Sequence, residues 1–157
     1  MSDQTKPVLA PRFVDAPARQ IVGVTERYAK NEQSGIPDQW ARVAQAQNAL
    51  LAGRETFGVA YDFDDHAFSY LIGVEDSPDT DSTGLTRVSI PAGHCAVFDL
   101  GGTVADIPAL WEAILGGWSD EAGYAFTGDP EYEIYEPNYN PQSPGGMSVW
   151  MPVRPKG

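Results

Sequence analysis

The sequence predicts an α+β domain made of two similar halves, each with the element order strand, helix, strand, strand. Two segments begin alike: APARQIVGV from Ala16 to Val24 and IPAGHCAVF from Ile90 to Phe98, each with a proline ahead of a short strand-like run. Each is followed by a turn-rich stretch, an amphipathic helix and two strand-like segments. We therefore expect a duplicated β-α-β-β module whose halves cover about residues 16–76 and 90–154.

Length and composition favour a single domain. We expect it to span residues 13–157, after a flexible tail of residues 1–12. The N-terminus has no apolar h-region, and no apolar run is long enough to cross a bilayer, so neither a signal peptide nor a membrane partner is expected. The single cysteine, Cys95, rules out an internal disulfide and favours a cytoplasmic location.

The charge balance argues against a nucleic-acid partner. The chain has 22 acidic and 10 basic side chains and a net charge of −12, with no cluster of Lys and Arg that would bind a phosphate backbone. No helix-turn-helix pattern precedes residue 17. An acidic field raises the local concentration of cations. The same charge also keeps a small domain soluble, and we favour this simpler interpretation of the charge.

Two helices are expected. The first runs from Pro37 to about Leu51, because proline suits the first helical position and Gly53 favours a stop. We expect the second to begin with Asp106 as its N-cap and to end at Gly116-Gly117. Its apolar stripe consists of Ile107, Leu110, Trp111, Ile114, Leu115 and Trp118.

Six strand-like segments follow from period-two alternation and turn residues. Asp64-Asp65 predicts a tight hairpin between two of them, and Pro91-Ala92-Gly93 predicts a turn between another two. The segments span residues 56–63, 66–75, 85–90, 94–100, 131–137 and 148–153, of which 85–90 is an addition between the halves.

The segment GDPEYEIYEP, residues 128–137, places an acid in the middle of an aromatic strand. Alternation puts Glu133 and Tyr135 on one face and Tyr132 on the other. Burying a carboxylate without a partner is unfavourable, so either this face is solvated or the acid awaits a ligand. A lipophilic cation would be such a ligand, because both the carboxylate and the aromatic ring faces attract it.

Other chemistry is sparse. His66 and His94 are the only histidines and are too far apart in sequence to suggest a metal site. His94 and Cys95 point to opposite faces of a strand and do not form a ready catalytic pair. LGGTV and LGGWS lack the P-loop lysine and the dinucleotide fingerprint. We therefore expect no metal and no cofactor, and we assign no catalytic residue.

The order of motifs resembles the GyrI-like family, the effector-binding domain of AraC-type and MerR-type multidrug-responsive regulators, which also occurs as stand-alone proteins. The motifs are PARQIVGV, FGVAYDFD, FSYLIGVE, IPAGHCAVFDLGG, a helix ending in GGW, GYAFTGDPEYEIYEP and VWMPV. The resemblance implies a curved antiparallel sheet with two helices packed on it and pseudo-two-fold symmetry. It also implies a pocket for bulky, often cationic, aromatic molecules between the halves, with the acid of the aromatic-Glu-x-Tyr motif, here Glu133, inside it.

The candidate ligand-binding residues are acidic or aromatic. Trp150 lies on the closing strand, where an in-register hairpin would bring it beside the Glu133 face, although a core position fits equally well. Trp40 and Trp111 lie at core-facing positions of helices that would border such a pocket. The proline-rich loop of residues 137–146 either covers the site or is an ordinary hairpin loop. The full set is Glu133, Tyr135, Trp150, Trp111, Trp40, Tyr61, Phe68 and Tyr70.

The leading functional hypothesis is a stand-alone module that binds lipophilic, preferably cationic, aromatic small molecules. A second hypothesis is a hydrolase of reactive electrophilic small molecules, in which Glu133 activates water and Tyr135 donates a hydrogen bond. A third is a protein-interaction module like the family members that inhibit DNA gyrase. A protein partner and a homodimer both stay open.

Overall fold

The computed structural model describes residues 10–32 and 34–156. The elements of the first part of the chain are β1 (Arg12–Ala16), β2 (Arg19–Ala29), α1 (Ile36–Ala46), α2 (Asn48–Leu51), β3 (Thr56–Tyr61), β4 (Ala67–Glu75) and β5 (Thr86–Ile90). The second part contains β6 (Gly93–Asp99), the 3-10 turn η1 (Val104–Asp106), α3 (Ile107–Ala113), the π-helical η2 (Ile114–Trp118), α4 (Ser119–Ala122), β7 (Tyr124–Phe126), β8 (Glu131–Tyr135) and β9 (Met147–Pro155).

All strand pairs are antiparallel and form one curved sheet in the order β1-β6-β9-β8-β3-β4-β2-β5, with β7 paired to β9. This confirms the predicted α+β class and curved antiparallel sheet. The strand order reads alike in both directions from the central β3–β8 pair: β3, β4, β2 on one side and β8, β9, β6 on the other. That order supports the duplicated β-α-β-β module, which stays a prediction.

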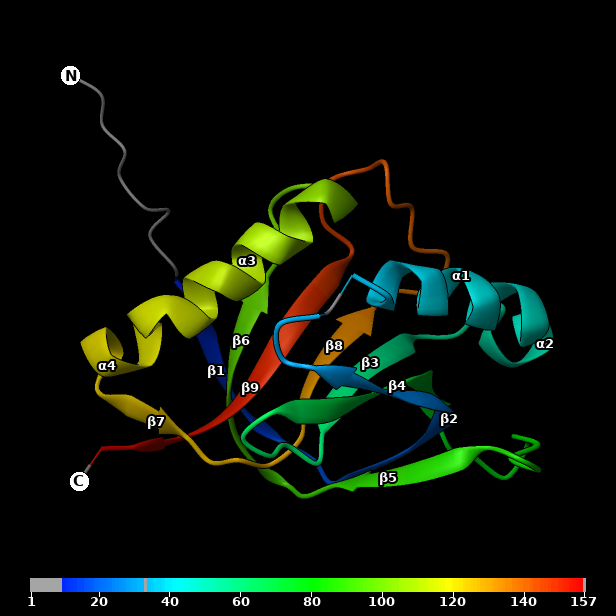
Figure 1. The fold of residues 1–157 in the computed structure, drawn as a ribbon, viewed down its shortest axis with the longest axis horizontal. Coiled ribbons are helices and arrows are strands. Elements are labelled where there is room, and N and C mark those ends of the chain that lie inside the picture. Colours follow the sequence, from blue (N-terminus) through cyan, green and yellow to red (C-terminus); the bar gives the residue numbers. More distant parts are fainter. Residues whose placement is uncertain (1–9, 33, 157) are drawn as a thin grey trace.

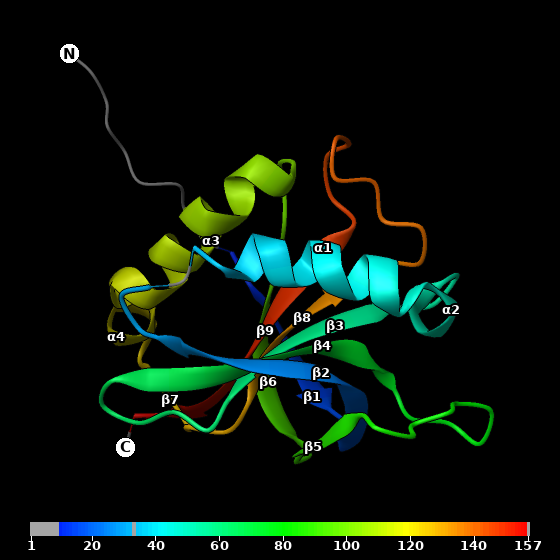
Figure 2. The same ribbon diagram turned by 45° about the vertical axis from the view of Figure 1, so that its right-hand side comes forward.

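Both long helices lie on the same face of the sheet (Figure 1, Figure 2). Because strand residues alternate between faces, each strand supplies one side chain in two to the layer under the helices. Under α3 and η2 this layer contains Phe98, Val149 and Met151, and under α1 it contains Tyr70 and Ile72. Glu133 and Tyr135 point into the same layer, so the helices cover the face that carries the acid.

The other face is enclosed by the sheet itself. Strands β5 and β6 lie near opposite ends of the strand order, yet only Pro91 and Ala92 join them. Two residues bridge at most about 11 Å, so the ends of the sheet must curl toward each other. The predicted turn at this position therefore links the two ends of the sheet and does not fold a hairpin.

An arginine whose side chain is 11% exposed shows how strongly the sheet is curved. The Arg19 guanidinium carbon lies 5.4, 5.8 and 5.4 Å from the ring centroids of Phe57, Tyr132 and Trp150. Arg19 belongs to β2 and Trp150 to β9, which are four strands apart in the sheet order. The guanidinium also forms an ion pair with Glu75, with Nη1 2.6 Å from Oε1. The face without helices thus has its own core.

Three expectations about element boundaries were wrong. Residues 1–9 of the predicted tail lie outside the described residues, but Arg12 belongs to β1 and its side chain pairs with Asp99. The first helix is interrupted at Gln47, whose φ and ψ of −120° and 32° are not helical. The second helix does not end at Gly116-Gly117. It kinks there, because Gly117 has a φ of 116°, and continues as α4.

The start of the second helix also differs from the prediction. Asp106 does not cap α3 through its side chain, because its carboxylate Oδ2 accepts a hydrogen bond from the Thr103 N–H at 2.9 Å and so closes the preceding 3-10 turn. The predicted hairpin is confirmed, since β3 pairs with β4, but its connection spans residues 62–66 and not the tight Asp64-Asp65 turn that was expected. There the Asp64 Oδ1 accepts the N–H groups of His66 and Ala67 at 2.7 and 2.8 Å.

Candidate functional site

Glu133 lies in the middle of β8, close to the centre of the sheet. Its neighbours across the strands are Gly58 in β3 and Val149 in β9. Only 4% of the residue surface is exposed, so the carboxylate is buried between the sheet and the helices. An acid at such a position needs specific partners, because desolvation disfavours its charged form.

Two neutral donors occupy the two carboxylate oxygens. The Tyr70 hydroxyl donates to Oε1 at 2.5 Å, and the Trp111 indole Nε1–H donates to Oε2 at 2.7 Å. The Trp40 indole Nε1–H in turn donates to the Tyr70 hydroxyl oxygen at 3.2 Å. The strand β4 and the helices α1 and α3 thus each place one side chain in a single network around Glu133.

Gly58 makes room for the Tyr70–Glu133 contact. A methyl group at this position would overlap the Tyr70 hydroxyl and lie 2.7 Å from Glu133 Oε1. Glycine therefore allows the two side chains to meet directly above the β3 backbone.

Further aromatic rings close over this network. The Trp40 and Tyr135 ring centroids are 4.8 Å apart in an edge-on arrangement, and those of Tyr135 and Tyr139 are 5.0 Å apart. Tyr139 belongs to the loop between β8 and β9, which rises on the helix side of the sheet (Figure 1, Figure 2). We call the side chains that surround the carboxylate the aromatic cover: Trp40, Tyr70, Trp111, Tyr135 and Tyr139.

Burial dominates the electrostatics of this network. It raises the pKa of Glu133, while hydrogen bonds from Tyr70, Trp111 and Tyr135 partly offset the increase. Burial and the Glu133 charge raise the pKa of the Tyr70 and Tyr135 phenols well above their usual value, so both keep their protons and remain donors. Within the described part of the chain, the groups that stabilise the Glu133 carboxylate are all neutral.

A second acid lies on the same face of β8. Alternation from Glu133 places the Glu131 side chain under the helices too, opposite Ala60 of β3. Glu131 is half-buried, and burial raises its pKa to about 7.

Gln39 was not recognised from the sequence. This α1 residue is fully buried, and its amide Nε2 donates to the Val24 and Tyr70 carbonyls at 3.2 and 3.0 Å, while its Oε1 accepts the Tyr28 hydroxyl at 2.7 Å. It fixes α1 to the strands β2 and β4. The available signal was its position four residues before the buried Val43, on the same helix face.

Two of the predicted site residues lie on the opposite face from Glu133. Trp150 is paired with Tyr132, and their rings stack with centroids 5.6 Å apart, so of the two positions left open for it the structure shows the one in the core of this face and not the one beside Glu133. Tyr61 shares that face, and its hydroxyl is 2.8 Å from Thr25 Oγ1. Cross-strand partners always lie on the same face of the sheet, so the register between two strands decides whether a residue shares the face of Glu133 or lies on the opposite one.

The remaining predicted aromatic residue lies on the same face of the sheet as Glu133 but outside the network. Phe68 is buried beneath α1, with its ring 6.2 Å from those of both Tyr28 and Phe63. Of the predicted site residues, the structure therefore brings together Glu133, Tyr135, Trp111, Trp40 and Tyr70.

The part of the chain that the structure describes shows no group of three or more His, Cys, Asp or Glu side chains arranged to hold a metal ion. Across residues 10–32 and 34–156, no helix combines the length and the apolar character needed to cross a bilayer.

The comparisons with known proteins concern both family and fold. The model of the GyrI-like small molecule binding domain matches residues 9–154. The structure of SAV2435 bound to tetraphenylphosphonium is similar with a TM-score of 0.80 and 21% identity, over 93% of this chain and 94% of that one. Among curated proteins, none matches this chain.

Two further solved structures share the fold. A putative bacterial transcription regulation protein from Staphylococcus aureus MU50 has a TM-score of 0.73 and 17% identity, over 94% of this chain and 99% of that one. The EcmrR C-terminal domain has a TM-score of 0.61 and 14% identity, over 94% and 99% of the two chains. Since the family model covers nearly the whole sequence, the chain belongs to the GyrI-like family of small molecule binding domains.

Proposed function

We propose that this domain binds bulky lipophilic cations, with Glu133 as the counter-ion and the aromatic cover as the wall of the site. One observation carries the proposal: Glu133 is 4% exposed and receives only neutral donors from the described residues. A buried carboxylate without a cationic partner is poorly compensated, and a cation that enters supplies the missing charge.

The chemistry of the surrounding rings narrows the class of ligand. Aromatic faces attract cations and bury large apolar areas, so the site favours a cation that carries rings of its own. The opposite face of the sheet already holds a cation in this way, because the Arg19 guanidinium lies among three aromatic rings there. The similarity to SAV2435, whose structure contains tetraphenylphosphonium, supports the same class of ligand.

Binding at Glu133 requires the aromatic cover to move. Side chains of the cover fill the space next to the carboxylate, and Trp111 occupies Oε2 directly. A ligand therefore replaces the Trp111 hydrogen bond by a charge contact. Trp111 lies in α3, and the backbone just after this helix is not helical at Gly116 and Gly117. We propose that a shift of α3 at this kink would move Trp111 away from the carboxylate.

A tryptophan-fluorescence titration tests the proposal, because Trp40 and Trp111 both contact the network. The ligands are tetraphenylphosphonium and the neutral triphenylphosphine oxide, titrated at fixed salt into wild type and Glu133→Gln. We expect the wild type to prefer the cation. The substitution should weaken the cation about 5- to 150-fold, equivalent to about 1–3 kcal/mol for a charge-assisted contact, and spare the neutral compound.

Glu136→Gln is the matched control, because Glu136 follows the same strand but is exposed. It should leave both affinities unchanged. Equal weakening of the cation and the neutral compound by Glu133→Gln would show that the charge of Glu133 has no role. The hydrolase and gyrase-inhibitor alternatives stay predictions. Turnover beyond one equivalent per protein, abolished by Glu133→Gln, would favour the hydrolase.

A further inference from the structure

A second carboxylate lies next to Glu133 along the same strand. Glu131 and Glu133 are two residues apart in β8, so their side chains leave the same face of the sheet at a spacing of roughly 7 Å. Glu131 is half-buried, whereas Glu133 is 4% exposed. The two acids therefore lie at different depths of one face, with Glu133 inside the aromatic cover and Glu131 nearer to water.

Glu131 has no partner that would compensate its burial. Among the described residues, no hydrogen bond or ion pair involves its side chain. Burial alone raises its pKa to about 7, and neither a hydrogen bond nor a neighbouring charge offsets this effect. A partly desolvated carboxylate of this kind is stabilised by a cation that reaches it.

The strand neighbours of Glu131 connect it to the aromatic cover. Glu131 is the cross-strand partner of Ala60 in β3, and Ala60 is in turn the partner of Tyr70 in β4. These three side chains point to the same face of the sheet, because cross-strand partners do so. Ala60 places a single methyl group between Glu131 and Tyr70, and Tyr70 is the residue that donates to Glu133. A flat ring above Ala60 is therefore within reach of the Tyr70 ring and of both carboxylates.

The other end of this row of side chains is aromatic and contains an unpaired hydroxyl. Beyond Glu133 the next residue on the same face is Tyr135, whose ring contacts Trp40 and Tyr139. The Tyr139 hydroxyl is buried and has no hydrogen-bond partner among the described residues. Burial and the Glu133 charge raise the pKa of Tyr139, which places its phenol within electrostatic reach of Glu133. Because an unpaired buried hydroxyl is unfavourable, it is an independent sign that a ligand completes this site.

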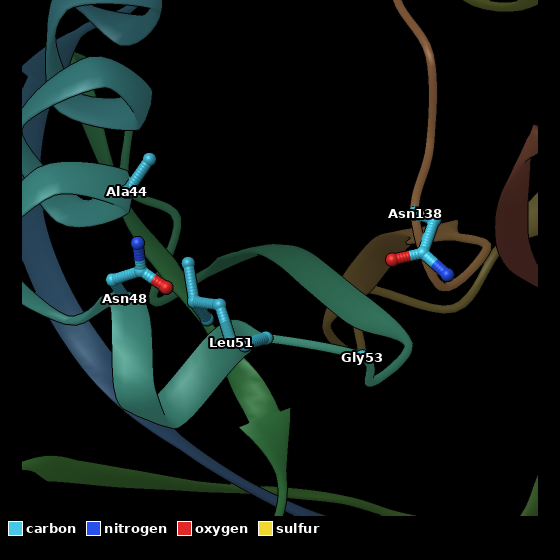
Figure 3. A pocket seen from close by; sticks show the side chains of 6 residues that line it. Ala44, Asn48, Leu51, Gly53 and Asn138 are labelled. Atoms are coloured by element: carbon cyan, nitrogen blue, oxygen red, sulfur yellow. The ribbon is translucent and has the colours of Figure 1, made fainter.

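The surface depression beside α1 offers no alternative position for a second charge. It is open to solvent, and Figure 3 shows Ala44, Asn48 and Leu51 on its helical side and Asn138 across from them. Its lining residues are all uncharged. A ligand held at Glu133 therefore meets a second carboxylate along β8 and not in this depression.

We infer that Glu131 is a second anionic position of the proposed cation site and makes the site prefer elongated aromatic dications to monocations of the same shape. The inference rests on the proposed function and deepens it, since it names the class of ligand. One charge of the ligand lies at Glu133, and the other lies at Glu131, at the edge of the aromatic cover. The ring system between the two charges lies over Ala60 and against Tyr70.

The test compares two rigid probes by calorimetry at pH 8 and fixed salt, where the Glu131 carboxylate is mostly ionised. The dication is methyl viologen, a bipyridinium whose two nitrogen atoms are separated by about the spacing of Glu131 and Glu133 along β8. The monocation is N-methyl-4-phenylpyridinium, which has nearly the same size and shape but a single charge. The difference in affinity between the two probes isolates the second charge.

We expect the wild type to bind methyl viologen about tenfold more tightly than the monocation, as a charge-assisted contact in a partly dry site provides. Glu131→Gln should remove this preference and leave the affinity for the monocation unchanged, while Glu131→Asp should keep part of the preference. Glu133→Gln should weaken both probes. Glu136→Gln is the matched control, because it removes the same charge from an exposed residue directly after β8. It should keep the preference, which separates the role of Glu131 from the general attraction of dications to an acidic protein.

Three results would overturn the role of Glu131: a wild type without the preference, a preference that Glu131→Gln leaves unchanged, and equal weakening of both probes by Glu131→Gln. In each case the proposed function stands if tetraphenylphosphonium binds the wild type and weakens in Glu133→Gln. Failure of tetraphenylphosphonium to bind the wild type would overturn the proposed function and the role of Glu131 together.

Discussion

The Tyr70 hydroxyl meets the Glu133 carboxylate at 2.5 Å, although 63 residues separate them in the sequence. The contact depends on the central β3–β8 pair, since Tyr70 reaches Glu133 across Gly58 of β3. It therefore joins the two halves of the sheet as well as stabilising a buried charge.

Tyr70→Phe should destabilise the fold by about 1–3 kcal/mol, because it removes one donor from a buried carboxylate. Urea unfolding at pH 7 measures the effect. The loss should shrink in a Glu133→Gln background, since the charge that needs the donor is then absent. Equal losses in the two backgrounds would mean that the hydroxyl acts independently of Glu133.

Gly58→Ala should destabilise the protein by about 1–3 kcal/mol, as overpacking does in a filled core. The added methyl group would force Tyr70 and Glu133 apart. Gly93→Ala is the matched control, because a methyl group at Gly93 meets nothing within 4 Å. Thermal unfolding of the two variants compares them directly, and similar midpoints would contradict the packing described around Gly58.

Gln39→Leu should destabilise the protein by about 1–3 kcal/mol, because the Tyr28 hydroxyl and the Val24 and Tyr70 carbonyls each lose a buried partner. The exposed Gln45 on the same helix gives the control, and Gln45→Leu should stay within about 0.5 kcal/mol of wild type. Denaturant midpoints of both variants provide the measurement. A neutral Gln39→Leu would show that α1 docks without this residue.

Glu131 should make stability depend on pH near neutrality. Burial raises its pKa from an ordinary value of 4.5 to about 7 in the folded protein, so the folded state holds the proton more tightly. The stabilising contribution is complete below pH 4.5 and is lost as the pH rises through 7. Glu131→Gln should therefore gain stability relative to wild type between pH 5 and pH 8, as measured by urea unfolding, whereas the exposed Glu136→Gln should not.

Trp111→Phe should strengthen binding of tetraphenylphosphonium several-fold. An aromatic ring remains at this position, but phenylalanine lacks the indole N–H that donates to Glu133 Oε2. One hydrogen bond fewer within the protein therefore has to break when the ligand binds. Calorimetry gives the affinity, and an affinity as weak as that of Glu133→Gln would show that Trp111 holds the ligand and does not oppose it.

Local sequence patterns predicted what depends on neighbouring residues. Period-two alternation placed Glu133 and Tyr135 on one face, and helical spacing placed Trp40 and Trp111 at the covered side. The same patterns could not assign Trp150 to a face, because that depends on the register between β8 and β9 across an irregular loop. Nor could they pair Tyr70 with Glu133, which requires long-range strand contacts.

The roles of residues that depend on three-dimensional packing could not be predicted from the sequence either. Gln39 looks like an ordinary polar helix residue until α1 is docked on β2 and β4. Arg19 looks like a surface charge until the sheet curls and places it over the Trp150 ring. The closure of the sheet follows from the short Pro91-Ala92 link, whose consequence depends on which strands β5 and β6 join.

The depth at which Glu133 is buried sets what kind of cation can reach it. The net charge of −12 draws all cations toward the surface, where exposed carboxylates hold them with their hydration shells intact. Inside the aromatic cover there is little room for those hydration shells. For sodium, magnesium and polyamines, the free energy needed to remove the water would exceed the free energy gained from the contact with Glu133. The proposed site would thus select cations by how readily they give up water, and would stay responsive to lipophilic ions in the presence of a large excess of salt.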